Sequence, residues 1–281
     1  MAVRIITDST CDITLEDREK MDINVVPLTV NFTDASYADG IDITNEQFFD
    51  KLETCKTLPT TSSVAPQSFI DAFQEGLDAG DEIVGVFISG DVSGTFQSAC
   101  IAKDSIESGS DKIHLVDSRN TTIALALLVF EAVKCRDEGM AASEIASHIN
   151  SLTPKVRLMA LVNTLKYLHK GGRLSLTSTV IGEIIGIKPL MSIVDGKVAA
   201  IGKARGIPAS LKLMLQKVLE ELPDKRYTFV FGHACAPEAL EKLLDIIKEP
   251  LQITEWFTCN IGSIVGTHVG KGAIGFAYVA E

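Results

Sequence analysis

The sequence predicts an α/β fold with two domains, an N-terminal parallel α/β/α domain followed by a C-terminal mixed-sheet α/β domain of about six strands. Its 281 residues exceed the roughly 100–200 residues of an average domain. Short apolar runs alternate with segments of helical period, which is typical of β–α–β units. Asp195-Gly196 separates two apolar runs and predicts a β-hairpin, so the second sheet is expected to contain antiparallel strands.

In the first half, strands alternate with helices as in a doubly wound domain. Thr44 and Gln47 have the spacing of a capping box, and Pro66 suits the first turn of the following helix. The predicted strands are Val3–Thr7, Ile23–Val30, Glu82–Ile88 and Lys112–Asp117. The predicted helices follow Thr44, begin near Pro66, and cover Thr95–Glu107 and about Thr121–Glu138.

The segment Ser151–Lys155 interrupts the helical pattern, so we place the domain boundary there and expect domains 1–154 and 155–281. The predicted strands of the second half are Val156–Val162, Pro189–Val194, Lys197–Ile201, Tyr227–Phe231, Ile253–Cys259 and Ile274–Val279. The predicted helices are a short one between Asn163 and Gly171, then Ser178–Ile185, Leu211–Leu222 and Pro237–Lys248.

Composition and net charge disfavour several classes of protein. The net charge of −11 disfavours binding to nucleic acid and to anionic lipid surfaces. The richest apolar run, Ile123–Phe130, is too short to span a membrane, and the N-terminus has no signal-like apolar segment, which indicates a cytoplasmic protein. The six cysteines form no C-x-x-C pair, and no histidine stands beside a cysteine in the sequence, so neither a metal nor a cofactor is expected.

Two hydroxyl-bearing segments suggest a pocket for a small anion. Ser93-Gly94 lies between a predicted strand and a helix, where backbone amides and the helix dipole favour negative charge. Thr60-Thr61-Ser62-Ser63 precedes another helix, and its hydroxyls suit a carboxylate or phosphate oxygen. Ligands of open α/β sheets bind outside the carboxyl ends of the strands, which favours both segments together. Each segment alone is equally well explained as a helix cap or a polar loop.

A glycine-rich segment, Gly266–Gly275, matches neither a P-loop nor a dinucleotide-binding fingerprint, so ATP binding is not expected there. His268 in this predicted loop is a candidate donor to an anion, with an ordinary surface histidine as the alternative. Arg173 and Arg205 stand beside glycines, and their guanidinium groups suit phosphate or carboxylate, although either is also explained as a surface charge.

Together these segments resemble the DegV family of bacterial lipid-binding proteins. The resemblance covers the whole chain and rests on motifs in both halves. In the first half these are Ile6-Thr-Asp-Ser-Thr10, Pro59-x-Thr-Ser62, Ser93-Gly-Thr95 and Val116-Asp-Ser118. In the second half they are Leu168-x-Lys-Gly-Gly-Arg-Leu174, Lys188-Pro189, Gly202-Lys-x-Arg205 and the segment from Gly266-x-His268 to Gly275.

The resemblance implies that one long-chain fatty acid is bound in the cleft between the domains, with its carboxylate held by Thr61, Ser62, Ser93, the Gly94 amide and His268. It also implies a lipid-binding subunit that is not itself an enzyme. A separate ATP-binding kinase subunit would phosphorylate the bound acid, and Arg173 and Arg205 would engage that partner or its phosphates at the cleft mouth.

The chain departs from the family pattern at two places. Ser63-Val64 stands where Gln-Pro is usual, and Lys271, where proline is common, is expected to add positive charge near the carboxylate. For the acyl tail the apolar candidates are Phe96, Ile181, Ile184 and Ile185, with ordinary core positions as the alternative.

Two enzyme functions are alternatives. One is an acyl hydrolase or transferase with Ser93 as nucleophile and His268 as base. Ser93 does not stand in a G-x-S-x-G motif, and the sequence does not identify an acidic partner for His268. The other is a kinase resembling dihydroxyacetone kinase, which the chain disfavours because it has no recognisable nucleotide-binding loop.

Overall fold

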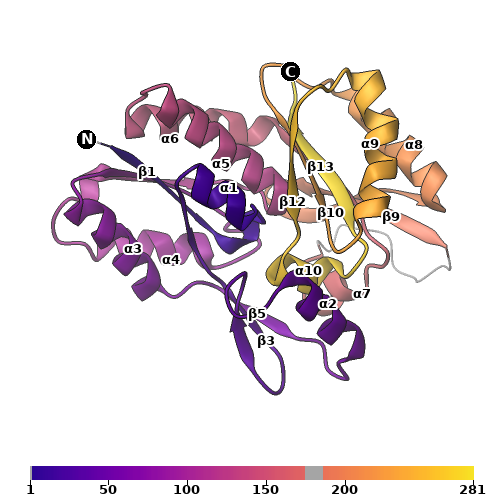
Figure 1. Ribbon diagram of the computed structural model, residues 1–281, viewed down its shortest axis with the longest axis horizontal. Coiled ribbons are helices and arrows are strands. Elements are labelled where there is room, and N and C mark those ends of the chain that lie inside the picture. Colours follow the sequence, from indigo (N-terminus) through magenta and orange to yellow (C-terminus); the bar gives the residue numbers. More distant parts are fainter. Residues whose placement is uncertain (1, 175–185) are drawn as a thin grey trace.

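A computed structural model describes residues 2–174 and 186–281, and Figure 1 shows how their elements are arranged. These residues form a four-stranded sheet, a six-stranded sheet and a small three-stranded sheet. The two larger sheets correspond to the parallel sheet and the mixed sheet that the sequence predicts. The predicted helix Ser178–Ile185, together with the tail candidates Ile181, Ile184 and Ile185, lies outside the described residues.

The first sheet is entirely parallel and has the strand order β2-β1-β6-β7. Its strands are β1 (Val3–Asp8), β2 (Ile23–Val26), β6 (Glu82–Phe87) and β7 (Ile113–Asp117). Alternate side chains point to opposite faces: Ile6 and Phe87 pack toward one helix pair, and Ile5 and Val86 toward the other. The first pair is α3 (Pro66–Asp78) and α4 (Thr95–Asp104), and the second is α5 (Thr122–Asp137) and α6 (Ala142–Leu152). The predicted parallel α/β/α layer is therefore confirmed.

The second sheet has six strands in the order β10-β9-β8-β13-β11-β12 and is mixed, because β11 and β12 run parallel while the other neighbours run antiparallel. The strands are β8 (Val156–Leu161), β9 (Ile187–Val194), β10 (Lys197–Arg205), β11 (Phe229–His233), β12 (Trp256–Asn260) and β13 (Ile274–Val279). The predicted hairpin is present: Asp195 and Gly196 have φ of 50° and 80°, as a two-residue type I′ turn requires. Helices α8 (Ile207–Glu220) and α9 (Pro237–Leu251) cover one face.

Several elements differ from the prediction. The expected strand Ile23–Val30 is interrupted at Pro27, which has no amide hydrogen to donate to a sheet. The chain resumes as β3 of the small sheet, and the predicted hydroxyl loop is β5 of that sheet rather than a loop. The three short strands are β3 (Thr29–Asn31), β4 (Ser36–Ala38) and β5 (Thr60–Ser62). Helices α1 (Leu15–Lys20) and α6 were not predicted.

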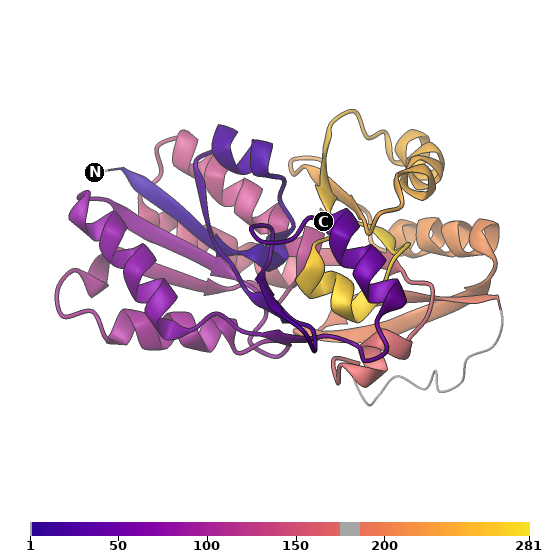
Figure 2. The same cartoon turned by 60° about the horizontal axis from the view of Figure 1, so that its bottom comes forward.

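The small sheet and α2 (Asn45–Thr54) belong to the first half of the chain but pack against the second half (Figure 2). Phe48 and Phe49 of α2 share a core with Ile264 and Val265 of α10 (Ser263–Val269). This contact requires glycine at position 266, since a Cβ atom there would lie 2.7 Å from the Phe49 ring. His268 therefore lies in a packed helix, which corrects the expectation of a loop.

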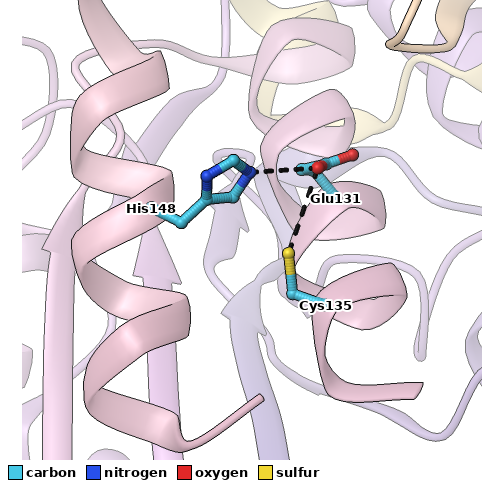
Figure 3. Close-up of side chains that lie close together, drawn as sticks. All are labelled: Glu131, Cys135 and His148. Atoms are coloured by element: carbon cyan, nitrogen blue, oxygen red, sulfur yellow. Dashed lines mark hydrogen bonds and ion pairs between the residues drawn. The ribbon is translucent and has the colours of Figure 1, made fainter. Parts of the chain in front are cut away.

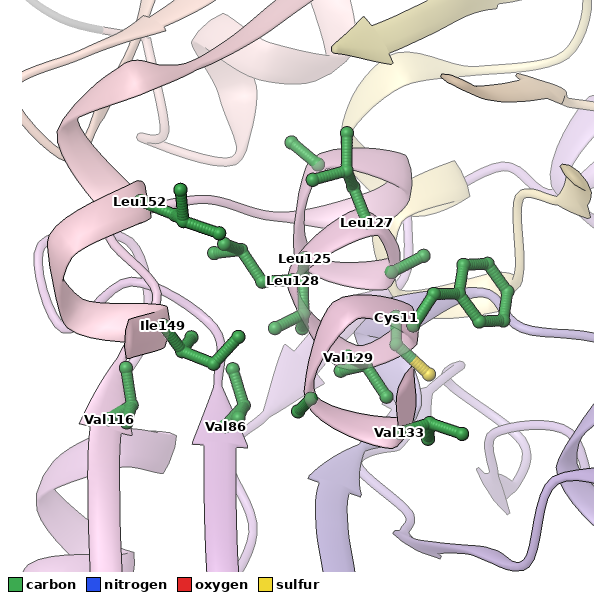
Figure 4. Close-up of a cluster of buried hydrophobic side chains, with 14 of the residues drawn as sticks. Cys11, Val86, Val116, Leu125, Leu127, Leu128, Val129, Val133, Ile149 and Leu152 are labelled. Atoms are coloured by element: carbon green, nitrogen blue, oxygen red, sulfur yellow. The ribbon is translucent and has the colours of Figure 1, made fainter. Parts of the chain in front are cut away.

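Helix α5 lies between the two larger sheets and is buried on nearly all sides. Figure 4 shows Leu125 and Leu128 among side chains from the four-stranded sheet and α6. The same helix also contacts β8, β11 and β13 of the six-stranded sheet. This double packing explains the apolar run Ile123–Phe130 that stands out in the sequence. Within residues 2–174 and 186–281, no helix has both the length and the apolar character needed to cross a membrane.

Candidate functional site

A cavity of 340 Å³ opens where the two larger sheets and the small sheet meet, and residues from both halves of the chain line it. Its volume is in the range of roughly 300–1,000 Å³ that is typical of small-molecule pockets. The walls are mainly apolar and include Ile88, Leu158, Val162, Met191, Val198 and Ile264. Phe96, a tail candidate, is half-buried against the core and is not part of this wall.

Small residues on two neighbouring strands leave this space open. Ala160 of β8 and Gly275 of β13 face each other in the sheet, and both line the cavity. A Cβ atom at Gly275 would lie 2.5 Å from the Met159 carbonyl oxygen, so this position admits only glycine without movement of the backbone. Because larger side chains at these positions would fill the cavity, its volume depends on this pair.

The polar residues on the wall come from three elements that meet at one place. Thr61, Ser62, Ser93, Gly94 and His268 all line the cavity, so the fold brings together the five residues that the sequence singles out. The Thr61 hydroxyl is 3.1 Å from Nε2 of His268, which is a hydrogen-bond distance.

Further contacts place the start of α4 beside this polar group. A Cβ atom on Gly94 would lie 3.6 Å from Oγ of Ser63, so the residue after β5 lies close to the N-cap of α4. Oγ of Ser93 is 3.0 Å from Oγ1 of Thr95 and accepts the Thr95 amide at 3.3 Å. The result is a cluster of neutral hydroxyl groups at a helix N-terminus, which is suited to an anion.

Three polar residues that the sequence did not single out also line the cavity: Thr121, Thr122 and Ser192. Ser63, from the hydroxyl-rich segment that the sequence did single out, lines it as well. Thr121 and Thr122 begin α5 after β7, in the same strand-to-helix position that identified Ser93. The rule that ligands bind beyond the carboxyl ends of parallel strands would have found them.

His268 is held in a nearly closed environment in the last turn of α10. A Cβ atom at Gly171 would lie 2.3 Å from its Nδ1, so only glycine leaves room for the ring at this distance. Nδ1 is buried and has no hydrogen-bond partner among the residues that the structure describes. Burial, together with the positive charge of Arg173, lowers the pKa of His268 to about 4, so the ring is neutral at neutral pH.

The alternative of a Ser93–His268 catalytic pair does not match this geometry. Ser93 contacts Thr95, and His268 contacts Thr61 through Nε2. No acidic residue within 2–174 and 186–281 hydrogen-bonds Nδ1 to orient the ring as a base. This arrangement lacks the hydrogen bonds by which a base activates a nucleophile.

The two arginines occupy different positions. Arg173 is exposed, lines the cavity and donates from Nη1 to the Gly171 carbonyl oxygen at 2.7 Å. Arg205 is exposed at the end of β10 and is not part of the cavity wall.

Lys271 does not add charge to the cavity, contrary to the expectation from sequence. Its Nζ lies 3.0 Å from Glu53 and 3.5 Å from Asp50, both on α2, and it is not among the lining residues. The acidic side chains of α2 lie close enough to pair with this lysine and balance its charge.

Comparison with known proteins shows to which family the chain belongs. A family model described as "Uncharacterised protein, DegV family" matches residues 2–281. A DegV domain-containing protein of Clostridium acetobutylicum is 36% identical over 281 residues, which are 99% of this chain and 99% of the relative. The chain belongs to the DegV family. The resemblance seen in the sequence motifs is thereby confirmed.

Solved DegV structures share the fold. A DegV family protein from Thermus thermophilus, described by its fatty acid binding, is 27% identical with a TM-score of 0.91 and covers 99% of this chain and 100% of its own. A protein of Eubacterium ventriosum described as stearic acid-binding is 26% identical with a TM-score of 0.89 and covers 100% and 98%. These structural neighbours of the DegV chain are thus proteins that bind fatty acids.

In this DegV protein, two buried carboxyl groups anchor α10 and one wall of the cavity. Asp12 accepts the Gly262 amide at 2.8 Å and the Thr122 hydroxyl at 2.6 Å. Asp39 accepts both the amide and the hydroxyl of Ser263, at 2.9 and 2.7 Å. Burial and the nearby Asp39 raise the pKa of Asp12 to about 8. This pair fixes the start of the helix that carries His268.

We expect Asp12→Asn to remove part of the pH dependence of stability. A carboxyl group with a raised pKa in the folded state keeps its proton between about pH 4 and pH 8, while the unfolded chain loses it, so stability falls as pH rises. The asparagine variant keeps an acceptor for Gly262 and lacks this proton. Urea unfolding at pH 6 and pH 8 should show that the free energy of unfolding falls more steeply with pH in the wild type than in the variant. The difference should be at most about 1.4 kcal/mol per pH unit. Parallel curves for the two proteins would contradict this assignment.

Proposed function

We propose that this protein binds one long-chain fatty acid in the cavity and presents its carboxylate to a separate ATP-binding kinase subunit for phosphorylation. The observation that carries the proposal is the combination of an apolar cavity with a neutral hydroxyl cluster on its wall. Fatty acids are what the similar DegV proteins of Thermus thermophilus and Eubacterium ventriosum are described as binding. The protein would act as the lipid-carrying subunit, and the kinase would supply the chemistry.

The acyl tail supplies most of the affinity in this proposal. A sixteen-carbon acid has about fifteen methylene or methyl groups at roughly 0.8 kcal/mol each, or about 12 kcal/mol of gross burial. Loss of freedom on binding consumes a large part of this energy. The net affinity therefore depends on how many of these groups the cavity wall encloses.

Neutral groups around the carboxylate suit its further reaction. Thr61, Ser62 and Ser93 offer hydroxyl donors, and the Gly94 amide lies at the positive end of α4. His268 is neutral at neutral pH and so adds a hydrogen-bonding group rather than a countercharge. A carboxylate held by single hydroxyl donors, rather than by a bidentate arginine, keeps an oxygen available to attack a phosphorus atom.

Ser93→Ala should weaken fatty acid binding about tenfold or more, because a hydrogen bond to a charged group contributes roughly 1.5–3 kcal/mol. Titration with a fluorescent long-chain fatty acid measures the change. Ser68→Ala, at an exposed position on α3 outside the cavity, is the matched control and should bind like the wild type. Equal affinity for the Ser93 variant and the wild type would remove Ser93 from the headgroup site.

Arg205→Ala should slow phosphorylation of the bound acid by the kinase subunit at least tenfold while leaving fatty acid affinity within twofold. Arg205 is exposed and does not line the cavity, so its guanidinium group can contact a partner or the partner's phosphates without touching the bound acid. Acyl phosphate formed with ATP and the kinase can be trapped with hydroxylamine and counted. Lys242→Ala on α9 removes an exposed positive charge elsewhere and should have no effect. Loss of lipid affinity with an unchanged phosphorylation rate would place Arg205 in lipid binding instead.

A further inference from the structure

A second group of reactive side chains lies between α5 and α6, on residues that do not line the fatty acid cavity. It consists of Glu131 and Cys135 from α5 and His148 from α6 (Figure 3). Glu131 and Cys135 are four residues apart on one helix and so share a face. The antiparallel return of the chain into α6 places His148 opposite them. One carboxylate, one thiol and one imidazole thus meet, although no histidine stands beside a cysteine in the sequence.

The spacing of the three groups fits a single small cation. Nε2 of His148 is 3.0 Å from Oε1 of Glu131, and Sγ of Cys135 is 3.9 Å from the same oxygen. All three potential ligand atoms lie within 4.8 Å of one another. Tetrahedral Zn²⁺, with bonds of about 2.0–2.3 Å, holds its ligand atoms about 3.3–3.6 Å apart. Small side-chain rotations are enough to reach that geometry.

Burial and charge favour the same ion. Cys135 is buried, and the side chains of Glu131 and His148 are only 11% and 29% exposed. A carboxylate, a thiolate and a neutral imidazole together carry two negative charges, which a divalent cation balances inside the protein. The Cys135 thiol also lies near Glu138 and Lys134, whose opposite charges act on it in opposite directions.

A neighbouring hollow of 730 Å³ reaches one of the three ligands, because its wall includes Glu131 together with Tyr227. An ion and a fourth ligand could approach the site from this side. Arg226, on the same wall, pairs with Asp224 at 2.5 Å, so its charge is already balanced. Three protein ligands with an open side filled by water are a common arrangement for Zn²⁺.

We propose that Glu131, Cys135 and His148 form a Zn²⁺ site that joins α5 to α6. Binding replaces the thiol proton of Cys135, which is released to solvent, with a zinc–sulfur bond, and water completes the four ligands. The site fastens the C-terminal half of α5, whose first residues Thr122 and Ile123 line the fatty acid cavity. It does not depend on the proposed function.

Cobalt is the most direct probe, because Co²⁺ adopts the same geometry and its thiolate bond absorbs light. The full-length protein, stripped with a chelator, should bind one Co²⁺ with a sulfur-to-cobalt band in the near ultraviolet, and Zn²⁺ should displace it. Cys135→Ser should abolish the band, and His148→Ala should weaken metal binding at least tenfold. Mg²⁺, which prefers oxygen ligands, should not compete.

Two control variants remove the same residue types elsewhere. Cys100→Ser on α4 and His169→Ala on α7 (Lys166–Lys170) should leave the cobalt spectrum unchanged. Circular dichroism and fatty acid content should be the same in all variants, which separates loss of metal from loss of fold. The absence of a sulfur-to-cobalt band in the wild type, or a band that persists in Cys135→Ser, would overturn the proposal.

Discussion

Replacing Ala160 with phenylalanine is expected to lower the affinity for a sixteen-carbon fatty acid about 100-fold. Ala160 lies on β8 and faces the cavity beside Gly275, where a Cβ atom would lie only 3.1 Å from that of Ala160. A phenyl ring in a cavity of 340 Å³ takes the place of about four methylene groups of the tail. At roughly 0.8 kcal/mol each, their loss amounts to about 3 kcal/mol, which corresponds to a factor of about 100.

The measurement is a binding titration with fatty acids of increasing length. Shorter acids should lose less affinity than longer ones, because the ring shortens the tail space without touching the polar residues. Ala209→Phe adds the same ring at an exposed position on α8 and should bind like the wild type. Unchanged affinity of the Ala160 variant for all lengths would mean that the tail lies elsewhere.

Gly275→Ala is expected to reduce the free energy of unfolding by about 2–3 kcal/mol. The new Cβ atom would lie 2.5 Å from the Met159 carbonyl oxygen and 3.0 Å from the Ala160 Cα atom. Both are backbone atoms of the neighbouring strand, so no side-chain rotation relieves the contact. β13 must move away from β8 in the middle of the six-stranded sheet, which weakens their hydrogen bonds.

Urea unfolding followed by circular dichroism measures this loss. Gly94→Ala is the matched control for stability, because its Cβ atom meets nothing closer than 3.6 Å and its φ of −70° suits alanine. That variant should unfold within about 1 kcal/mol of the wild type. An equal urea midpoint for Gly275→Ala and the wild type would show that β13 and β8 are not packed at this distance.

The two larger sheets could be predicted from the sequence because their strands are long enough to show periodicity. The hairpin was predictable because Asp195-Gly196 provides the two positive φ angles that the turn needs. The small sheet was not predictable, since its strands have only three residues each. A pattern of alternating side chains cannot be recognised over so short a length.

The helix that carries His268 was missed for a related reason. Gly262, Gly266 and Gly270 suggest a loop, yet the last two each have a separate cause in the fold. Gly266 makes room for the Phe49 ring, and Gly270 has a φ of 75° where the helix ends. Close packing against α2 decides the structure here, and this contact joins residues more than 200 positions apart.

The polar part of the candidate site was more predictable than the apolar part. Ser93 follows from a general rule about the ends of parallel strands, which also applies to Thr122. The hydroxyls near Thr61 were identified by residue type, because they lie on β5 of the small sheet. The cavity depends on which small side chains face one another across β8 and β13, and the sequence does not give that pairing. The grouping of Glu131, Cys135 and His148 likewise depends on how α5 and α6 pack.

Native mass spectrometry of the protein as purified from cells shows whether a fatty acid is bound. We expect one fatty acid per chain, retained under gentle conditions and released on denaturation, where its length can be read from its mass. Ala160→Phe should carry none or a shorter acid, in agreement with the binding titrations. A folded protein that is free of lipid as purified, and that stays free after incubation with sixteen- and eighteen-carbon acids, would contradict fatty acid binding.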